Sequence, residues 1–335
     1  MRLSVLDQSV ALEGRPHDLS IRNTVALAQL CDELGYARFW VSEHHNHPTI
    51  VGTAPEIVMA AIAATTSRIR IGSAGIMLPH YSAFKVAEVF RVLDALAPGR
   101  IDMGLGRAPG SDGRTAFALN PAANERPEHF PADVRDLIAW VHGEKLVDGH
   151  PFGAVKALPQ TDTAPEVWIL GSSDYGAQVA AIFGLPYCFA YFFSDGRGAT
   201  QAIDLYRKSY RPSARHPKPA AGYCVAAFAA DSEEKAQHHF TSRAVNRIRR
   251  DRGELVALLS PEEAMKVPLA AHEQARLERM RQEAFVGTPD KVAQQIRDLA
   301  AQDGIDEMAI VTWTYDEEVR RDSYRLLAKE FGLLT

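Results

Sequence analysis

The sequence predicts an α/β protein with the fold of a (β/α)8 barrel, also called a TIM barrel. Eight short runs of β-branched and other apolar residues alternate with longer segments whose apolar residues recur at helical spacing. This alternation is typical of a parallel sheet in which a helix follows each strand. The length of 335 residues fits one barrel with insertions, so we expect a single domain over residues 1–335. An open, doubly wound sheet is the alternative.

The predicted strands are spread along the whole chain, and several of them run into polar or glycine-rich residues. In a barrel of this class the active site lies at the carboxyl ends of the strands. The residues just after each strand are therefore the first candidates for function. The predicted strands cover residues 3–6, 38–42, 69–77, 101–105, 166–170, 187–192, 223–228 and 307–311.

The predicted helices each carry an apolar stripe that can face a barrel. In the first helix, Ile21, Val25, Ala28 and Cys31 fall on one face. A last helix at residues 316–331 follows the eighth strand and would complete the barrel.

Two insertions interrupt the strand and helix alternation, one after strand 4 and one after strand 7. The first covers about residues 143–165 and contains the turn-like segment 147–150, which favours a hairpin. The second, at about residues 253–285, is polar and helical in composition. Thr288 and Pro289 then provide a helix cap and a first-turn proline for the next barrel helix.

Composition and charge exclude several classes of protein. The net charge of −5 gives no reason to expect a nucleic-acid partner. The longest apolar stretches fall far short of the ~20 residues that span a bilayer, and no apolar leader follows Met1, so we expect no membrane partner and a cytoplasmic location. Cys31, Cys188 and Cys224 lack metal-ligand spacing and are predicted to be reduced core residues.

The densest functional signal is Glu43-His44-His45, which follows the second predicted strand. A metal site would need a matching His or Asp pair at another strand end, and no other strand end supplies one. A plain structural strand end is a second alternative. We favour a His44 that takes part in catalysis or contacts a cofactor.

The third predicted strand is built from small residues, including Gly72, Ala74 and Gly75. Glycine weakens a strand and usually marks a bulge or the close approach of another group. A flat aromatic ring lying against the backbone would explain these residues. A barrel strand kept small to fit the interior side chains explains them equally well.

Gly104, Gly106 and Arg107 lie at the end of the fourth predicted strand. Glycine amides can approach a ligand closely, and a guanidinium makes a forked contact with phosphate. The spacing is not that of a dinucleotide fingerprint, because no third glycine and helix follow. The segment therefore indicates an anion site of modest specificity.

Gly171, Ser172 and Ser173 stand where the fifth predicted strand ends and a helix begins. Serine hydroxyls and the free amides of a helix N-terminus can bind an anion and would complement Arg107. Each serine is also a common helix N-cap, and that simpler function remains open.

Taken together, these segments resemble the luciferase-like, flavin-dependent monooxygenase family, which includes the bacterial luciferase subunits. The resemblance runs over nearly the whole chain. It rests on Leu34-Gly35-Tyr36, Phe39-Trp40-Val41-Ser42-Glu43-His44-His45, Ile71-Gly72-Ser73-Ala74-Gly75-Ile76-Met77-Leu78-Pro79, Ala87-Glu88, Leu93-Asp94, Pro98-Gly99-Arg100, Gly171-Ser172-Ser173, Gly184-Leu185-Pro186 and Val286-Gly287-Thr288-Pro289.

The resemblance implies a TIM barrel that binds reduced FMN at the carboxyl ends of its strands. In similar proteins the pair that matches Ala74-Gly75 can be a non-prolyl cis peptide, and the arginine that matches Arg107 holds the phosphate. The implied catalytic residues are His44, His45 and Asp112. The implied cofactor-binding residues are Glu43, Ala74, Gly75, Gly106, Arg107, Gly171, Ser172 and Ser173, and no metal is expected.

The family further implies a two-component monooxygenase. FMNH2 from a separate, transiently bound flavin reductase would react with O2, and a flavin C4a-peroxide would oxidise a small organic substrate. Gly106 stands where the luciferase catalytic subunit has a reactive cysteine, and the segment at about residues 253–285 differs from the luciferase lid, so light emission is not expected. Apolar and aromatic residues near strand ends could line the substrate site: Tyr81, Phe117, Tyr191, Phe192 and Trp313.

Three alternative functions remain. Hydride transfer with the deazaflavin F420 occurs in the same superfamily, but Arg107 favours the nearly dianionic phosphate of FMN. A flavin-binding protein without turnover is the second alternative, and His44 argues against it. A metal-dependent hydrolase is the third.

A homodimer is predicted from the helix at about residues 55–66. Ala60, Ala61, Ala63 and Ala64 put small residues around much of its surface, whereas barrel packing needs only one apolar stripe. Related proteins use this region to dimerise, and a two-fold contact would bring the same helix of each chain together. The alternative is that these alanines pack only within their own barrel.

Overall fold

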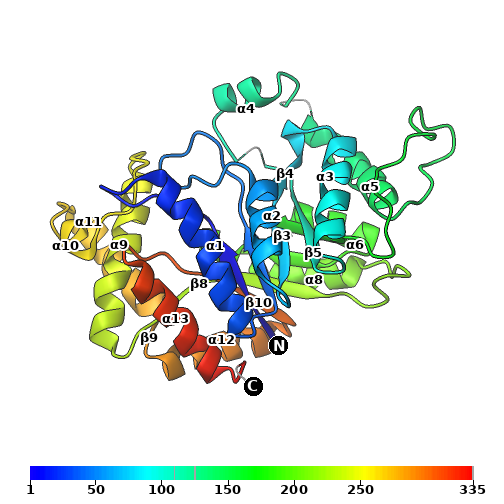
Figure 1. The fold of residues 1–335 in the computed structure, drawn as a ribbon. Coiled ribbons are helices and arrows are strands. Elements are labelled where there is room, and N and C mark those ends of the chain that lie inside the picture. The colour runs from blue at the N-terminus through cyan, green and yellow to red at the C-terminus, as the bar shows by residue number, and fades with distance from the viewer. Residues whose placement is uncertain (109, 124–125, 334–335) are drawn as a thin grey trace.

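A closed barrel of eight parallel strands forms the centre of the computed structural model (Figure 1), which describes residues 1–108, 110–123 and 126–333. The ring closes because β10 pairs with both β1 and β8, in parallel register. The predicted (β/α)8 barrel is therefore confirmed. The barrel strands are β1 (Arg2–Asp7), β2 (Arg38–Val41), β3 (Arg70–Ser73) with β4 (Ile76–Met77), β5 (Ile101–Gly106), β6 (Glu166–Gly171), β7 (Tyr187–Phe189), β8 (Ala221–Ala229) and β10 (Glu307–Val311).

A helix follows each barrel strand and covers the outside of the ring. The first of these ends as its sequence suggests, because Gly35 lies just beyond it in the left-handed region at φ +83°. The barrel helices are α1 (His17–Glu33), α2 (Pro55–Thr65), α3 (Ala83–Leu96), α5 (Phe130–Val141), α6 (Asp174–Phe183), α8 (Ala199–Ser209), α12 (Pro289–Asp303) and α13 (Glu317–Glu330).

Further elements lie at the carboxyl ends of the strands. The second predicted insertion contains two helices and leads into a short strand that pairs with the end of β8. The sequence pattern did not predict this short strand. The additional elements are η1 (Leu78–His80), α4 (Gly113–Leu119), η2 (Arg126–Glu128), α7 (Tyr191–Ser194), α9 (Glu233–Asp251), α10 (Pro261–Met265), α11 (Ala271–Glu283) and β9 (Phe285–Gly287).

Two strand predictions need correction. The third strand is not continuous, because a cis peptide between Ala74 and Gly75 separates β3 from β4. The sixth strand ends at Phe189, and the aromatic residues after it form α7 instead. Asp195 then turns the chain in the left-handed region at φ +52°.

The hairpin expected at residues 147–150 is wrong. His150 N donates to Val147 O at 3.0 Å, but no strand flanks that turn. Nearby carbonyl groups bond to a side chain rather than to a strand, since Arg91 donates to Pro159 O and Thr163 O, each at 2.7 Å. This arginine anchors the insertion against α3.

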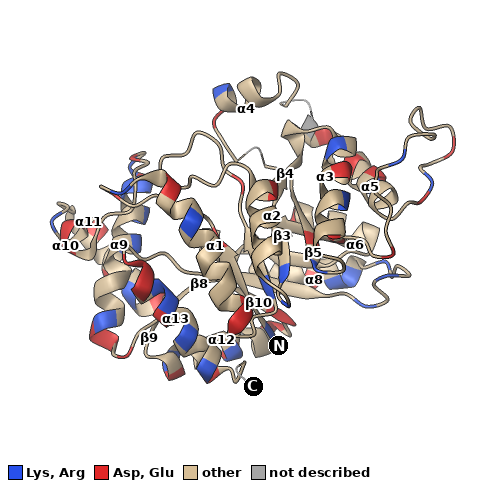
Figure 2. Ribbon diagram, in the orientation of Figure 1, with Lys and Arg blue, Asp and Glu red and all other residues tan. Residues whose placement is uncertain are grey.

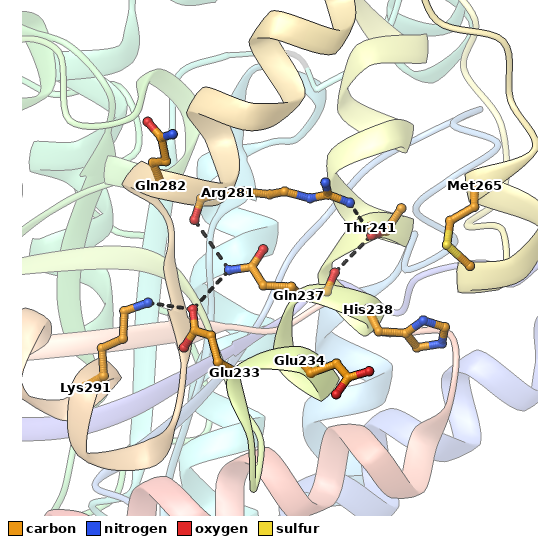
Figure 3. Close-up of a pocket in the computed structure, with 9 residues that line it drawn as sticks. All are labelled: Glu233, Glu234, Gln237, His238, Thr241, Met265, Arg281, Gln282 and Lys291. Atoms are coloured by element: carbon orange, nitrogen blue, oxygen red, sulfur yellow. Dashed lines mark hydrogen bonds and ion pairs between the residues drawn. The ribbon is translucent and has the colours of Figure 1, made fainter.

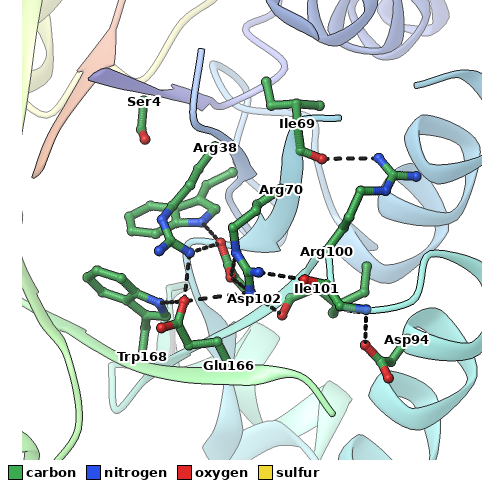
Figure 4. Close-up of polar contacts among 12 residues, drawn as sticks. Ser4, Arg38, Ile69, Arg70, Asp94, Arg100, Ile101, Asp102, Glu166 and Trp168 are labelled. Atoms are coloured by element: carbon green, nitrogen blue, oxygen red, sulfur yellow. Dashed lines mark hydrogen bonds and ion pairs between the residues drawn. The ribbon is translucent and has the colours of Figure 1, made fainter. Parts of the chain in front are cut away.

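A buried ion cluster fills the amino-terminal half of the barrel (Figure 4). Arg38 donates to Asp102 at 2.7 Å and to Glu166 at 2.8 Å, and its Nε forms an ion pair with Glu307 at 2.8 Å. Arg70 binds Asp102 as well, at 2.6 Å. These carboxylates raise the pKa of Arg38 against the opposing effect of burial. Because these charged side chains fill the amino-terminal end of the barrel, we expect a ligand to bind at the carboxyl ends of the strands.

No described helix is long and apolar enough to cross a membrane. Cys31, Cys188 and Cys224 are buried and unbridged, as predicted. Charges of both signs occur along α9 and α13 on the outside of the barrel (Figure 2). The α2 ribbon is almost free of charge, because Glu56 is its one ionisable residue.

Candidate active site

A cavity of about 630 Å³ opens at the carboxyl ends of the strands. Its lining comes from the ends of β1, β2, β4, β5, β6 and β7, from Cys224 of β8, and from the segment after α9. Ten of the eleven site residues predicted from the sequence lie on its wall: His44, His45, Ala74, Gly75, Gly106, Arg107, Asp112, Gly171, Ser172 and Ser173. Glu43 is the exception.

His44 follows β2 and faces this cavity. Its Nδ1 is buried and lacks a hydrogen-bond partner among the described residues, and its ring lies 5.8 Å from that of His47. Burial lowers the pKa of His44 to about 4, with further contributions from His47 and His45. His44 is therefore neutral near pH 7 and can accept a proton.

Glu43 lies behind the cavity wall, with no exposed surface. Its carboxylate accepts hydrogen bonds from Tyr81 Oη at 2.7 Å and from Met77 N at 3.0 Å, and it lies 2.7 Å from His45 Nε2. The pKa of Tyr81 is raised by burial first and then by this neighbouring charge. Glu43 thus joins the end of β2 to the segment after the cis peptide, and it contacts no part of the cavity itself.

Both explanations of the small-residue strand have support in the structure. A Cβ at Gly72 would lie 2.7 Å from the side chains of Trp40 and Asp102, so interior packing requires that glycine. A Cβ at Gly75 would lie 2.9 Å from Gly104 O, so β5 also approaches closely there. Ala74 and Gly75 nevertheless border the cavity, and neither carries a side chain larger than a methyl group.

The positively charged side chain of Arg107 lies at the edge of the cavity. The Arg107 guanidinium stacks over the ring of Tyr175, 3.9 Å from its centroid, and has no hydrogen bond or ion pair with the described residues. Ser173 is the N-cap residue of α6, yet its side chain makes no capping hydrogen bond. Ser172, also exposed, precedes it. These groups can together bind an anion at the helix N-terminus.

Asp112 lies at the rim of the cavity as the N-cap of α4. It accepts hydrogen bonds from Thr115 N at 3.1 Å and Arg114 N at 2.9 Å, and Asn46 Nδ2 lies 3.4 Å away. Hydrogen bonds from Thr115 lower the pKa of this carboxyl to about 2, with smaller contributions from Arg114 and Asn46. Asp112 is consequently ionised near pH 7 and engaged in capping.

The aromatic lining differs from the one expected. Phe192 lines the cavity, and Phe193 stacks on it with ring centroids 4.5 Å apart. Tyr81 binds Glu43 instead, and Phe117 is 60% exposed on α4. Four further residues line the cavity but were not predicted as site residues, because contacts between distant segments place them on its wall: Met77, Tyr175, Phe193 and Leu255.

A second cavity, of about 580 Å³, lies among α9, α10, α11 and α12 (Figure 3). Lys291 pairs with Glu233 at 2.7 Å, and Arg281 pairs with Glu278 at 2.8 Å. Its cations are thus already neutralised by neighbouring carboxylates. Within the described residues, no group of three or more His, Cys, Asp or Glu side chains is arranged to hold a metal ion.

Known proteins resemble this chain along most of its length. The uncharacterized protein YwcH of Bacillus subtilis is 40% identical over 98% of this chain and 99% of its own length. The N-acetyl-S-alkylcysteine monooxygenase of the same organism is 35% identical over 98% of this chain and 97% of its own length.

Solved structures share the fold. Apo-MsnO8 superposes with a TM-score of 0.88 at 34% identity and covers 99% of this chain and 98% of its own. The FMN complex of the oxygenating constituent of Pseudomonas putida 3,6-diketocamphane monooxygenase has a TM-score of 0.73 at 18% identity, covering 98% and 97%. An F420-dependent secondary alcohol dehydrogenase has a TM-score of 0.68 at 14% identity, covering 100% and 99%. These last two likenesses concern the fold alone.

The family described as luciferase-like monooxygenase matches residues 1–307. That range holds seven of the eight barrel strands, the first residue of β10 and every residue of the candidate site discussed above. With that match and the relatives above, the chain belongs to the luciferase-like monooxygenase family.

Proposed function

We propose that this protein is a monooxygenase that uses FMNH2 and O2 to oxidise a small organic molecule, with FMNH2 supplied by a separate flavin reductase. The observation that carries the proposal is that Arg107, which has no hydrogen bond or ion pair with the described residues, lines the same cavity of about 630 Å³ as Ser172 and Ser173. A cofactor with a terminal phosphate and a flat ring fits this combination.

The choice of FMN over F420 depends on charge. A phosphomonoester is nearly dianionic and accepts a forked contact from a guanidinium together with hydroxyl donors, whereas the F420 phosphate is a diester with one charge. Arg107, Ser172 and Ser173 would hold the phosphate, and Ala74 and Gly75 would border the ring. Bound there, the reduced flavin would supply the electrons that activate O2.

The protein's own groups would control protons and water in this reaction. Neutral His44 can accept a proton at Nδ1, which has no partner among the described residues. Apolar side chains around the cavity, including Met77 and Phe192, would limit the access of water to the reacting atoms. His45 is held in one orientation by Glu43.

We further propose that the substrate is a thioether. The support is the 35% identity with the N-acetyl-S-alkylcysteine monooxygenase over nearly the whole of both chains. The cavity is lined largely by apolar residues and can enclose a small sulfide beside the ring.

Anaerobic titration with FMNH2 and with reduced F420 tests the cofactor assignment, with binding followed by absorbance and calorimetry. Tight binding of FMNH2, and sulfoxide or cleavage products after O2 is admitted with a panel of thioethers, would support the proposal. Binding of reduced F420 alone would overturn it, and so would oxygen consumption without any organic product.

A further inference from the structure

Gln8 is a buried polar residue on the wall of the cavity, directly after β1. Trp313 Nε1 donates a hydrogen bond to its Oε1 at 3.0 Å. An indole N–H can only donate, so the carboxamide atom that faces Trp313 must be the oxygen. Trp313 does not itself line the cavity, so the oxygen of Gln8 is occupied by a residue outside it.

The nitrogen of the same carboxamide has no such partner. Gln8 Nε2 makes no hydrogen bond with any residue that the structure describes. A buried amide donor is destabilising unless it is hydrogen-bonded. Because Gln8 lines the cavity, the acceptor for this donor has to come from a molecule in the cavity.

The proposed cofactor contacts lie on another part of the barrel. Arg107 follows β5, Ser172 follows β6, and the Ala74-Gly75 peptide separates β3 from β4. The ring order places β2 between β1 and β3, and it places β1 four strands away from β6 in either direction. A flavin held along β4, β5 and β6 would therefore leave Gln8 on the opposite side, available to the organic substrate.

The cavity wall around Gln8 is apolar and uncharged. Leu6, Cys188 and Cys224 line the cavity and belong to one cluster of apolar side chains. Trp313, the partner of Gln8, packs against the same cluster. Burial raises the pKa of both thiols, so they are neutral near pH 7. A carboxylate would lose its hydration against this wall and gain only a neutral donor, whereas a carbonyl oxygen is satisfied by one hydrogen bond.

We propose that Gln8 Nε2 donates a hydrogen bond to a neutral carbonyl oxygen of the organic substrate, so that the protein selects thioethers that carry an uncharged carbonyl group. The inference rests on the proposed function, because that function places the substrate beside the flavin in this cavity. Gln8 is then a specificity-determining residue, and Trp313 positions it.

The test compares 5-(methylthio)pentan-2-one with methyl pentyl sulfide, which has CH2 in place of the carbonyl group. Affinities are measured by calorimetry with the flavin-free protein and again after anaerobic loading with FMNH2. Gln8→Met keeps the length of the side chain and removes the donor, so the ratio of ketone to sulfide affinity should fall about fivefold to tenfold. Gln201→Met, at an exposed position of α8, is the matched control and should keep the wild-type ratio.

Two further variants separate the contact from protein stability. Trp313→Phe removes the donor that fixes the carboxamide, so the ratio should fall by less than in Gln8→Met. The double variant Gln8→Met/Trp313→Phe leaves no indole donor without an acceptor and should show the full loss of the ratio. It provides the measurement if Gln8→Met alone does not fold.

An unchanged ratio in the variants that lack Gln8 would overturn the inference. Loss of FMNH2 affinity without a change of the ratio would overturn it too, because Gln8 would then contact the cofactor. Two results with wild type would have the same effect: failure to bind the ketone, and tighter binding of the carboxylate 4-(methylthio)butanoate than of the ketone.

Heptan-2-one, which has the carbonyl group but no sulfur, separates this inference from the proposed thioether oxidation. Gln8→Met should weaken the binding of heptan-2-one by the same factor as that of 5-(methylthio)pentan-2-one. If it does so while no thioether is oxidised in the presence of FMNH2 and O2, the carbonyl contact stands and thioether oxidation is wrong.

Discussion

The carboxylate of Glu43 holds His45 from behind the cavity wall, with Oε1 of Glu43 2.7 Å from Nε2 of His45. The same carboxylate accepts from Tyr81 Oη and Met77 N, so one buried acid joins the end of β2 to residues 77–81. His45 lines the cavity, whereas Glu43 does not. Glu43 is therefore a positioning residue, and its replacement should affect stability and geometry together.

Glu43→Gln should lower the free energy of unfolding by about 1 to 3 kcal/mol. A carboxamide places an NH2 group where the native site has an acceptor, so at least one of the donors Tyr81 Oη, Met77 N and His45 Nε2 would face another donor. Urea unfolding measures the change. Glu33→Gln, on the exposed face of α1, is the matched control and should be neutral. Equal stability of the two variants would contradict the buried network.

His44 should make stability depend on pH below about 6.5. Its folded pKa of about 4 lies below the unfolded value of 6.5, so the unfolded chain binds the proton more tightly. The stabilisation is complete above pH 6.5 and is lost as the pH falls towards 4. At pH 5, the loss for wild type should be about 2 kcal/mol larger than that for His44→Asn.

Denaturant unfolding at pH 8 and at pH 5 measures this difference, with His17→Asn as a control for a histidine at the exposed start of α1. If wild type and His44→Asn lose the same stability between the two pH values, His44 is not held neutral by burial. An activity profile offers a second check, because a limb due to His44 should lie near pH 4.

Arg107→Ala should weaken FMN binding by about 2 kcal/mol, or roughly 30-fold, while riboflavin binds both proteins alike. Riboflavin lacks the phosphate, so it reports contacts to the ring alone. Fluorescence titration measures both affinities. Arg114→Ala removes an exposed arginine on α4 and should keep the wild-type preference for FMN. A preference for FMN that survives in Arg107→Ala would contradict the phosphate assignment.

Much of the fold could be predicted because its signals are local. Each of the eight strand predictions overlaps a barrel strand, and Thr288-Pro289 begins α12 as expected. The errors occur where contacts between distant segments override the local sequence pattern. Residues 187–192 have the pattern of one strand, but the strand ends at Phe189, and Phe192 lies in α7 and lines the cavity.

The site was predictable to the extent that it follows strand ends. His44 and Arg107 each come just after a strand, and barrel topology brings such positions together. Local sequence did not show that Glu43 is withdrawn from the cavity. Its burial depends on contacts between segments far apart in the chain.

An apolar face on α2 and α3 carries the homodimer prediction. Ile57 is 68% exposed on α2, and Val92 and Leu96 are 48% and 60% exposed on the neighbouring α3. Ala61 and Ala64 are exposed between the larger side chains, whereas Ala60 is partly buried against the core. The exposed residues of this face are free to meet a second copy of the chain about a two-fold axis.

Ala64→Arg and Ile57→Arg should each convert the predicted homodimer into a folded monomer, because an arginine on this face would place two like charges together at a two-fold contact. Ala60 is unsuitable for the test, since arginine there would disturb the core as well. Ile182→Arg changes a residue of α6 that is 49% exposed and should leave the dimer intact. Light scattering gives the mass, and circular dichroism checks the fold. If both the Ala64 and the Ile57 variants stay folded and dimeric, this face is not the dimer interface and the chain associates through another surface.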